Sequence, residues 1–232
     1  MEQAKNKSFV ETLNPSVGRL QFLKYTGVAA LAGSALLIDS CKKDNNTGGN
    51  YNLGSGDTGI LNYAYALEQL EAAFYTQVMA TPYSGMTAQE TSILTDLMYH
   101  EVIHREFFKA ALGSSAIGSL QVNFSSIDFT SRTSVLAAAK AFEDTGVSAY
   151  DGAGYLIQNA AYLTIAGKIV SVEARHAALI RNLIANGTFA DSTVVDQSTG
   201  LNASASIAQV LPIANTYLKT KVTAKNFNYP TA

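Results

Sequence analysis

Residues 101–104 read Glu-Val-Ile-His, and residues 173–176 read Glu-Ala-Arg-His. Both are Glu-x-x-His steps, and both lie in long segments with helical periodicity. The chain has three histidines, so two of them in the same short motif are more than composition alone predicts. Positions i and i+3 share one face of a helix, so each step presents a carboxylate and an imidazole side by side. Such a pairing is typical of a metal site.

Four segments show apolar residues at helical spacing, which predicts an all-α fold. We expect helices over about residues 57–80, 87–112 and 160–186, and a further helix that begins near residue 132. Each apolar stripe is interrupted by polar residues at positions that face the core. These residues are Glu68 and Glu71 in the first segment, Glu101 and His104 in the second, Glu143 in the third, and Glu173 and His176 in the fourth.

Carboxylates inside a helical core are costly unless something neutralises them. Removing a lone carboxylate from water is strongly unfavourable, and several carboxylates close together also repel one another. They are tolerated when they are protonated, paired with cations or bound to metal. The basic residues near them, Arg105, Lys168 and Arg175, mostly fall off the apolar stripes. We therefore predict a metal site formed by Glu68, Glu101, His104, Glu143, Glu173 and His176.

This ligand set resembles the di-iron carboxylate arrangement of ferritin-like four-helix bundles. That arrangement takes one Glu from each of two helices and a Glu-x-x-His pair from each of the other two. The resemblance implies two iron ions, with manganese as the alternative, and it implies that Glu101 and Glu173 bridge them. The remaining ligands each bind one ion, Glu68 and Glu143 as single carboxylates and His104 and His176 as imidazoles.

Three stretches carry a narrower resemblance. They are LNYAYALEQLEAAFY at 61–75, HEVIHREFF at 100–108 and SVEARHAALIRNLI at 171–184. They resemble exported ferritin-like domain proteins, which include the plant desiccation-related proteins. The resemblance covers about residues 57–186. It implies the fold and the metal motif, but not one particular activity.

Several residues lie beside the predicted ligands. Glu71 shares the helix face of Glu68 and is either an additional ligand, a base beside the metals or a partner of an arginine. Tyr75 follows Glu68 by seven residues, and Tyr150 follows Glu143 by seven, as an internal duplication would give. Each tyrosine either simply packs in the core with its hydroxyl hydrogen-bonded, or has a role beside the site. In that role it hydrogen-bonds a metal ligand or relays an electron. His100 precedes Glu101 and points about 100° away from it, so we expect it at the surface or rim.

The connections predict the topology of the bundle, which we place at residues 57–186. The link at about 81–86 is short, which favours an antiparallel helical hairpin. The link at about 113–131 is long enough to run along the whole bundle. We therefore expect one crossover between helices two and three, which places these two helices parallel.

Residues 187–232 are expected to form a C-terminal extension that packs on the bundle. Asn186-Gly187 is a good helix stop. A fifth helix is expected within residues 203–220, broken by Pro212.

The beginning of the chain has the features of an export signal. Residues 1–40 combine a basic lead with a short apolar run at 25–38, and Cys41 follows as in a lipobox. We expect a signal peptide, lipidation at Cys41 and a polar, flexible tether over 41–56. Export follows either the general secretory or the twin-arginine route. The chain is then a lipoprotein of the bacterial cell envelope, on the periplasmic face or at the outer membrane. Its expected partner is the membrane, which it contacts through the N-terminal lipid anchor.

Charge and composition exclude some functions. The chain has 16 Lys and Arg against 18 Asp and Glu, with no basic stripe, so nucleic acid is not an expected partner.

Carboxylates with two imidazoles suit iron or manganese. Two such ions, held roughly 3.5–4 Å apart as in two-metal sites, can deliver two electrons to oxygen or peroxide. The leading hypothesis is an oxidoreductase that acts as a ferroxidase, a peroxidase or a catalase-like protein.

The alternative is a protein without catalysis. It is a stress- or desiccation-related structural or binding protein in which metal acts as a brace or the site is vestigial. The sequence leaves open whether the chain is an enzyme and assigns no catalytic residue. A homodimer is compatible with either hypothesis.

Overall fold

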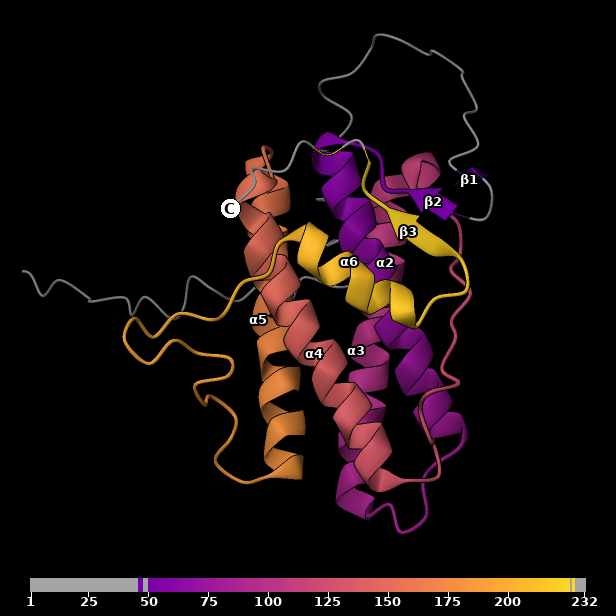
Figure 1. Ribbon diagram of the computed structural model, residues 1–232, viewed down its shortest axis with the longest axis vertical. Helices are drawn as coiled ribbons and strands as arrows, with labels where there is room; N and C mark the ends of the chain where they lie inside the picture. The colour runs from indigo at the N-terminus through magenta and orange to yellow at the C-terminus, as the bar shows by residue number, and fades with distance from the viewer. Residues whose placement is uncertain (1–45, 48–49, 226, 228–232) are drawn as a thin grey trace, which may run out of the picture. The chain divides into compact units, whose positions relative to one another are not determined.

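The computed structural model describes residues 46–47, 50–225 and 227. The predicted signal peptide and Cys41 lie outside the described residues. Four long helices and one short one dominate the described chain (Figure 1). They are α2 (Gly56–Ala80), α3 (Ala88–Leu112), α4 (Arg132–Ala153), α5 (Ala160–Ile184) and α6 (Ile207–Thr216). Two short 3-10 helices, η2 (Gly113–Ser115) and η3 (Gly154–Leu156), follow α3 and α4. The fold is all-α, as predicted.

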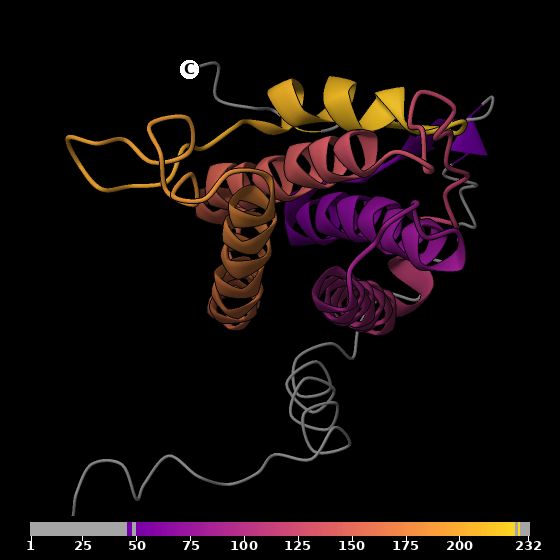
Figure 2. The same ribbon diagram turned by 90° about the horizontal axis from the view of Figure 1, so that it is seen from below.

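The long helices form two hairpins, α2 with α3 and α4 with α5. The two hairpins pack on each other through α2 and α4. Figure 1 shows that α3 and α4 run in the same direction, because the chain between them returns along the whole length of the bundle. Seen from below, α2 lies between α3 and α4 (Figure 2). Most of α2 is accordingly buried, including its polar residues Asn62, Glu68, Gln69 and Glu71.

Local signals explain where the helices begin. The Thr87 side chain accepts a hydrogen bond from the Glu90 backbone N–H, and the Glu90 carboxylate accepts one from the Thr87 N–H, which forms a capping box for α3. The same carboxylate lies 2.6 Å from Arg132 Nε at the start of α4. Arg132 also donates to the Leu183 carbonyl near the end of α5. One end of the bundle is therefore tied together across three helices.

The crossover packs on the bundle through spaced apolar residues. Val122, Phe124, Ile127 and Phe129 are half-buried against the core. The Phe124 ring lies 6.0 Å from that of Phe74 on α2, in an edge-to-face arrangement. These contacts hold the long link along the side of α2 and α4.

A small sheet closes one side of the domain and was not predicted. β2 (Asn50–Asn52) pairs antiparallel with β1 (Asn46–Thr47) and parallel with β3 (Lys221–Thr223). The sequence placed β1 and β2 in a flexible tether and β3 near the tail. The pairing joins segments from opposite ends of the chain, so no local period announces it.

The fifth helix lies within its predicted range but continues through Pro212. Proline removes the hydrogen bond to the carbonyl four residues earlier, that of Ala208. Ala208 is exposed, so water can satisfy this carbonyl and the helix need not break. In Figure 2, α6 lies along the outer side of α4 and α2. Within the described part of the chain, no helix is both long and apolar enough to cross a membrane.

A buried arginine fastens the loop after α5 to the bundle. Arg181 is 3 % exposed, and its guanidinium makes two hydrogen bonds of 2.7 Å to the Asp144 carboxylate on α4. It also donates to the Thr188 carbonyl, to Asp191 and to the Thr193 hydroxyl. The sequence does not indicate this role for Arg181, because an arginine at the edge of an apolar stripe usually reaches solvent.

We expect Arg181→Ala to lower the free energy of unfolding by about 3 kcal/mol, because it leaves Asp144 without its partner in a partly buried site. Arg175→Ala is the matched control, since Arg175 lies on the same helix and is exposed. Denaturant unfolding measures both variants. Equal stability of the two variants would contradict the anchoring role of Arg181.

Candidate metal centre

Four helices bring the six predicted ligands together at the middle of the bundle. Glu68 comes from α2, Glu143 from α4, and the two Glu-x-x-His pairs come from α3 and α5. The side chains of all four glutamates are fully buried. His176 is buried, and the His104 side chain is 12 % exposed. The helical spacing explains this convergence, because each acid lies on the face that its helix turns to the core.

The ligand atoms form two groups that share two members. One group is Glu68, Glu101, His104 and Glu173, and the atoms that these residues offer all lie within 4.8 Å of one another. The second group is Glu101, Glu143, Glu173 and His176, with the same limit. Glu101 and Glu173 belong to both groups. Each group can hold a metal ion, and the shared carboxylates lie where the resemblance places bridging ligands.

The atoms at the centre converge at ion-pair distances but outside hydrogen-bonding geometry. His104 Nδ1 lies 2.8 Å from Glu173 Oε1, and His176 Nδ1 lies 2.8 Å from Glu101 Oε1. These buried atoms lack a partner in hydrogen-bonding geometry within the described chain, as do the Oε2 atoms of Glu68 and Glu143. Buried polar atoms are nearly always satisfied. Lone pairs that point at a common space fit a bound cation, so the residues present fit metal ions.

Two tyrosines hold the single carboxylates in place. The Tyr75 hydroxyl donates to Glu143 Oε1 over 2.5 Å, and the Tyr150 hydroxyl donates to Glu68 Oε1. In each carboxylate the other oxygen, Oε2, faces the centre. Tyr75 of the first hairpin thus holds Glu143 of the second hairpin, and Tyr150 of the second hairpin holds Glu68 of the first. Each bond fixes the carboxylate orientation, so that one oxygen remains for a metal ion.

Glu71 is buried near the centre but belongs to neither ligand group. A Cβ atom at Gly146 of α4 would come within 3.0 Å of Glu71 Oε1, so the glycine makes room for this carboxyl. Burial, followed by the negative charges of Glu101 and Glu173, raises the pKa of Glu71 well above its usual value. Its absence from both ligand groups favours a role beside the site.

The third histidine lies on the rim, as expected, but it touches a ligand. His100 Nδ1 is 2.9 Å from His176 Nε2, and the two rings are nearly parallel. Since His176 turns Nδ1 to the centre, Nε2 is free to donate to His100 when Nδ1 binds a metal. Such a bond fixes the tautomer and the orientation of a ligating histidine. The motif did not reveal this contact, because α5 supplies the partner.

In the absence of metal, protons on the imidazoles and on some of the carboxyl groups balance the negative charge of the buried glutamates. Burial opposes the charged form of His104, but the facing carboxylates outweigh it and raise its pKa to about 12. The pKa of His176 is also raised strongly, for the same reason. Burial raises the pKa of Glu143 to about 7, and burial with the neighbouring Glu173 raises that of Glu101 well above normal. Against burial, the two imidazoles lower the pKa of Glu173 to about 2.

We expect metal affinity to rise with pH. Because both imidazoles hold a proton in the metal-free site, a metal that binds Nδ1 of each must displace two protons. These two protons alone change the affinity by about 100-fold per pH unit, and loss of the Glu143 proton around pH 7 adds to the effect, so binding weakens as the pH falls. Titration with manganous ion between about pH 6 and pH 8 measures this dependence. An affinity that does not change with pH would contradict the proposed ligands.

We expect His100→Ala to weaken metal binding by about 10- to 100-fold, because His176 loses the group that orients it. His100→Asn should restore part of the affinity, since its amide oxygen can accept from Nε2. Tyr99→Ala is the control, because Tyr99 is the neighbouring residue and is 57 % exposed. Metal titration of the three variants is the measurement. Wild-type affinity in His100→Ala would remove this residue from the site.

Comparison with protein families agrees with this geometry. A family model described as a ferritin-like domain matches residues 56–186. The match spans α2 to the end of α5 and includes all six predicted ligands. A comparison with curated proteins found no match. With more than half of its length matched, and with four helices arranged around a carboxylate and histidine centre, the chain belongs to the ferritin-like domain family.

Proposed function

We propose that this protein binds two iron ions, or two manganese ions, and uses them for redox chemistry on oxygen or peroxide, including the oxidation of ferrous iron. The observation that carries the proposal is the pair of ligand groups that share Glu101 and Glu173. A single ion does not need two shared carboxylates and two histidines. Two ions would use both features, because the shared carboxylates can bridge them and each ion can bind one histidine.

The donor set supports iron or manganese. The ligands are carboxylate oxygens with one imidazole nitrogen in each group, and neither group contains a thiolate. Oxygen-rich ligation of this kind suits iron and manganese better than copper or a structural zinc ion. When bound, two such ions supply the ability to exchange two electrons with a small oxidant.

The protein's own residues provide a rigid and dry surrounding. Tyr75 and Tyr150 hold the single carboxylates, and His100 bonds the ligand His176. The four glutamates are fully buried and the His104 side chain is 12 % exposed, so the centre is closed to large molecules. A site of this form suits a small oxidant, such as oxygen or peroxide, better than a large substrate.

The sequence supports a location in the bacterial cell envelope. The proposal follows from the basic and apolar lead of residues 1–40 and from Cys41 as a lipidation site. A lipid anchor would hold the domain at a membrane on the periplasmic face. Oxidation of ferrous iron or removal of peroxide outside the cytoplasm would then be its task.

A second candidate is a protein in which metal only braces the bundle. The complete burial of the glutamates favours this alternative, because a closed site also stabilises a fold without turnover. Metal content alone does not separate the two candidates. Reaction with an oxidant does.

We expect the purified full chain to bind about two metal ions, as two-metal sites do, and to consume oxygen or peroxide in the presence of ferrous iron. Glu101→Gln should lose both metal ions and this activity, because Glu101 belongs to both groups. Glu106→Gln is the matched control, since Glu106 lies on the same helix with its side chain 50 % exposed. Metal analysis and the initial rates of oxygen and peroxide consumption are the measurements.

The outcomes separate the candidates. Two bound ions together with a rate above that of free iron support the redox function. Two bound ions with a rate equal to the buffer control support the brace. Full metal content in Glu101→Gln would overturn the proposed centre itself.

A further inference from the structure

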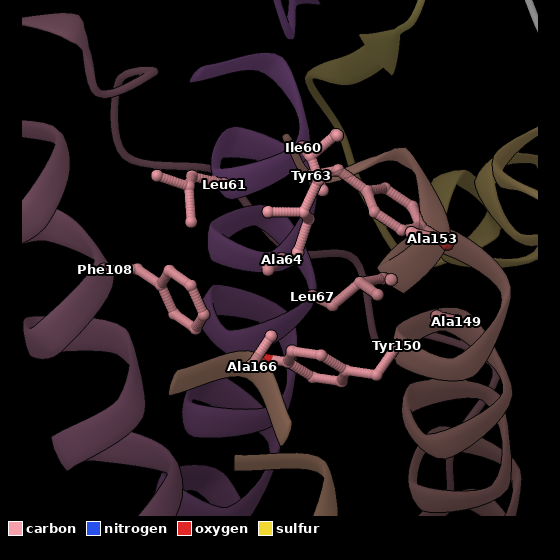
Figure 3. A pocket seen from close by; sticks show the side chains of 12 residues that line it. Ile60, Leu61, Tyr63, Ala64, Leu67, Phe108, Ala149, Tyr150, Ala153 and Ala166 are labelled. Carbon is pink, nitrogen blue, oxygen red and sulfur yellow. The ribbon is translucent and has the colours of Figure 1, made fainter. Parts of the chain in front are cut away.

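A narrow apolar cavity lies beside the candidate centre, between the two hairpins. Its walls come from α2, α3, α4, η3 and α5. Figure 3 shows Leu61 and Phe108 on one side and Ala149 and Ala153 on the other, with Tyr150 reaching across the space. The remaining lining residues include Ile60, Ala64, Leu67 and Ala166. Among the described residues that line it, only Tyr63 and Tyr150 carry polar side-chain atoms.

The cavity reaches the centre through Tyr150. The ring of this residue lines the cavity, and its hydroxyl donates to Glu68 Oε1. Leu67, which precedes Glu68 in α2, lines the same space. A molecule in the cavity is therefore separated from a proposed ligand by one side chain.

Small residues create this space. Ala64, Ala149, Ala153, Gly154 and Ala166 stand where larger apolar side chains would fill a helix interface. The cavity has a volume of about 20 Å³. Empty apolar space lowers stability, roughly in proportion to its volume. The bundle thus keeps a void of about one small molecule next to its centre.

The chemistry of the walls selects the occupant. A buried water needs about two to four polar partners, whereas nearly all of these walls are apolar and the Tyr150 hydroxyl is already bonded to Glu68. Apolar cavities instead stay dry and take up apolar molecules such as xenon. Dioxygen is small and apolar, so it fits both the size and the chemistry. Hydrogen peroxide, which has two hydroxyl groups, does not.

We propose that this cavity is a holding site for dioxygen, which enters past Gly154, Ile157 and Ala166 and waits beside Tyr150 and Glu68. These three lining residues are half-buried, whereas the α2 wall is buried. The role of this site depends on the proposed reaction with oxygen. Its ability to bind an apolar gas does not. It also specifies oxygen, rather than peroxide, as the oxidant that the protein concentrates.

Xenon binding to the full chain tests the cavity without any need for activity. We expect xenon in the cavity, seen as a shift of the ¹²⁹Xe resonance and as density in xenon-pressurised crystals. Ala166→Leu places a larger side chain at the entrance and should abolish this binding. Ala178→Leu is the matched control, because Ala178 lies on the same helix, is also half-buried and does not line the cavity.

Oxygen dependence tests the role of the site. In Ala166→Leu, loaded with metal to the wild-type level, the oxygen concentration at half-maximal rate should rise, while the dependence on peroxide stays unchanged. Circular dichroism and metal content confirm that each variant is folded. Absence of xenon from the wild-type cavity would overturn the proposal. So would xenon loss in Ala166→Leu with an unchanged oxygen dependence. Xenon binding in a wild-type protein that never consumes oxygen would support the gas site and overturn the redox function instead.

Discussion

The fold depends on one constraint, the meeting of several carboxylates inside an apolar bundle. Glu68, Glu101, Glu143 and Glu173 are each fully buried, and carboxylates in such surroundings are unfavourable unless positive charge or protons accompany them. Two imidazoles lie among them, 2.8 Å from the nearest carboxylate oxygens. The same convergence that is costly without metal forms two groups of side chains that can hold cations. Metal binding and folding are therefore expected to be coupled.

The rest of the bundle is organised to hold this arrangement in a fixed geometry. Each hairpin supplies one single carboxylate, one Glu-x-x-His pair and one tyrosine for the opposite hairpin. The long crossover lets α3 and α4 run parallel (Figure 1), so that the halves repeat each other around the centre. Arg181 of α5, which pairs with Asp144 of α4, fastens the loop that follows α5 to the bundle.

Much of the site was predictable because helices are local structures. The spacing of Glu68, of Glu143 and of the two Glu-x-x-His pairs placed six polar residues on core-facing positions. The structure brings all six together in two ligand groups. The seven-residue interval between Glu68 and Tyr75 also indicated a repeated arrangement, but not that Tyr75 donates to Glu143 rather than to its own helix. The pairing of β2 with β3 could not be predicted, since residues far apart in sequence form it.

By itself the sequence determined four amphipathic helices, their order and the acidic and imidazole side chains that each turns inward, because the period of a helix is written in consecutive residues. Only the tertiary structure decided which side chains form each ligand group, which tyrosine holds which carboxylate and that His100 touches His176. It alone also decided where small residues leave a cavity. These features depend on distances between helices. Such distances are set by packing across the whole core, which no single segment encodes.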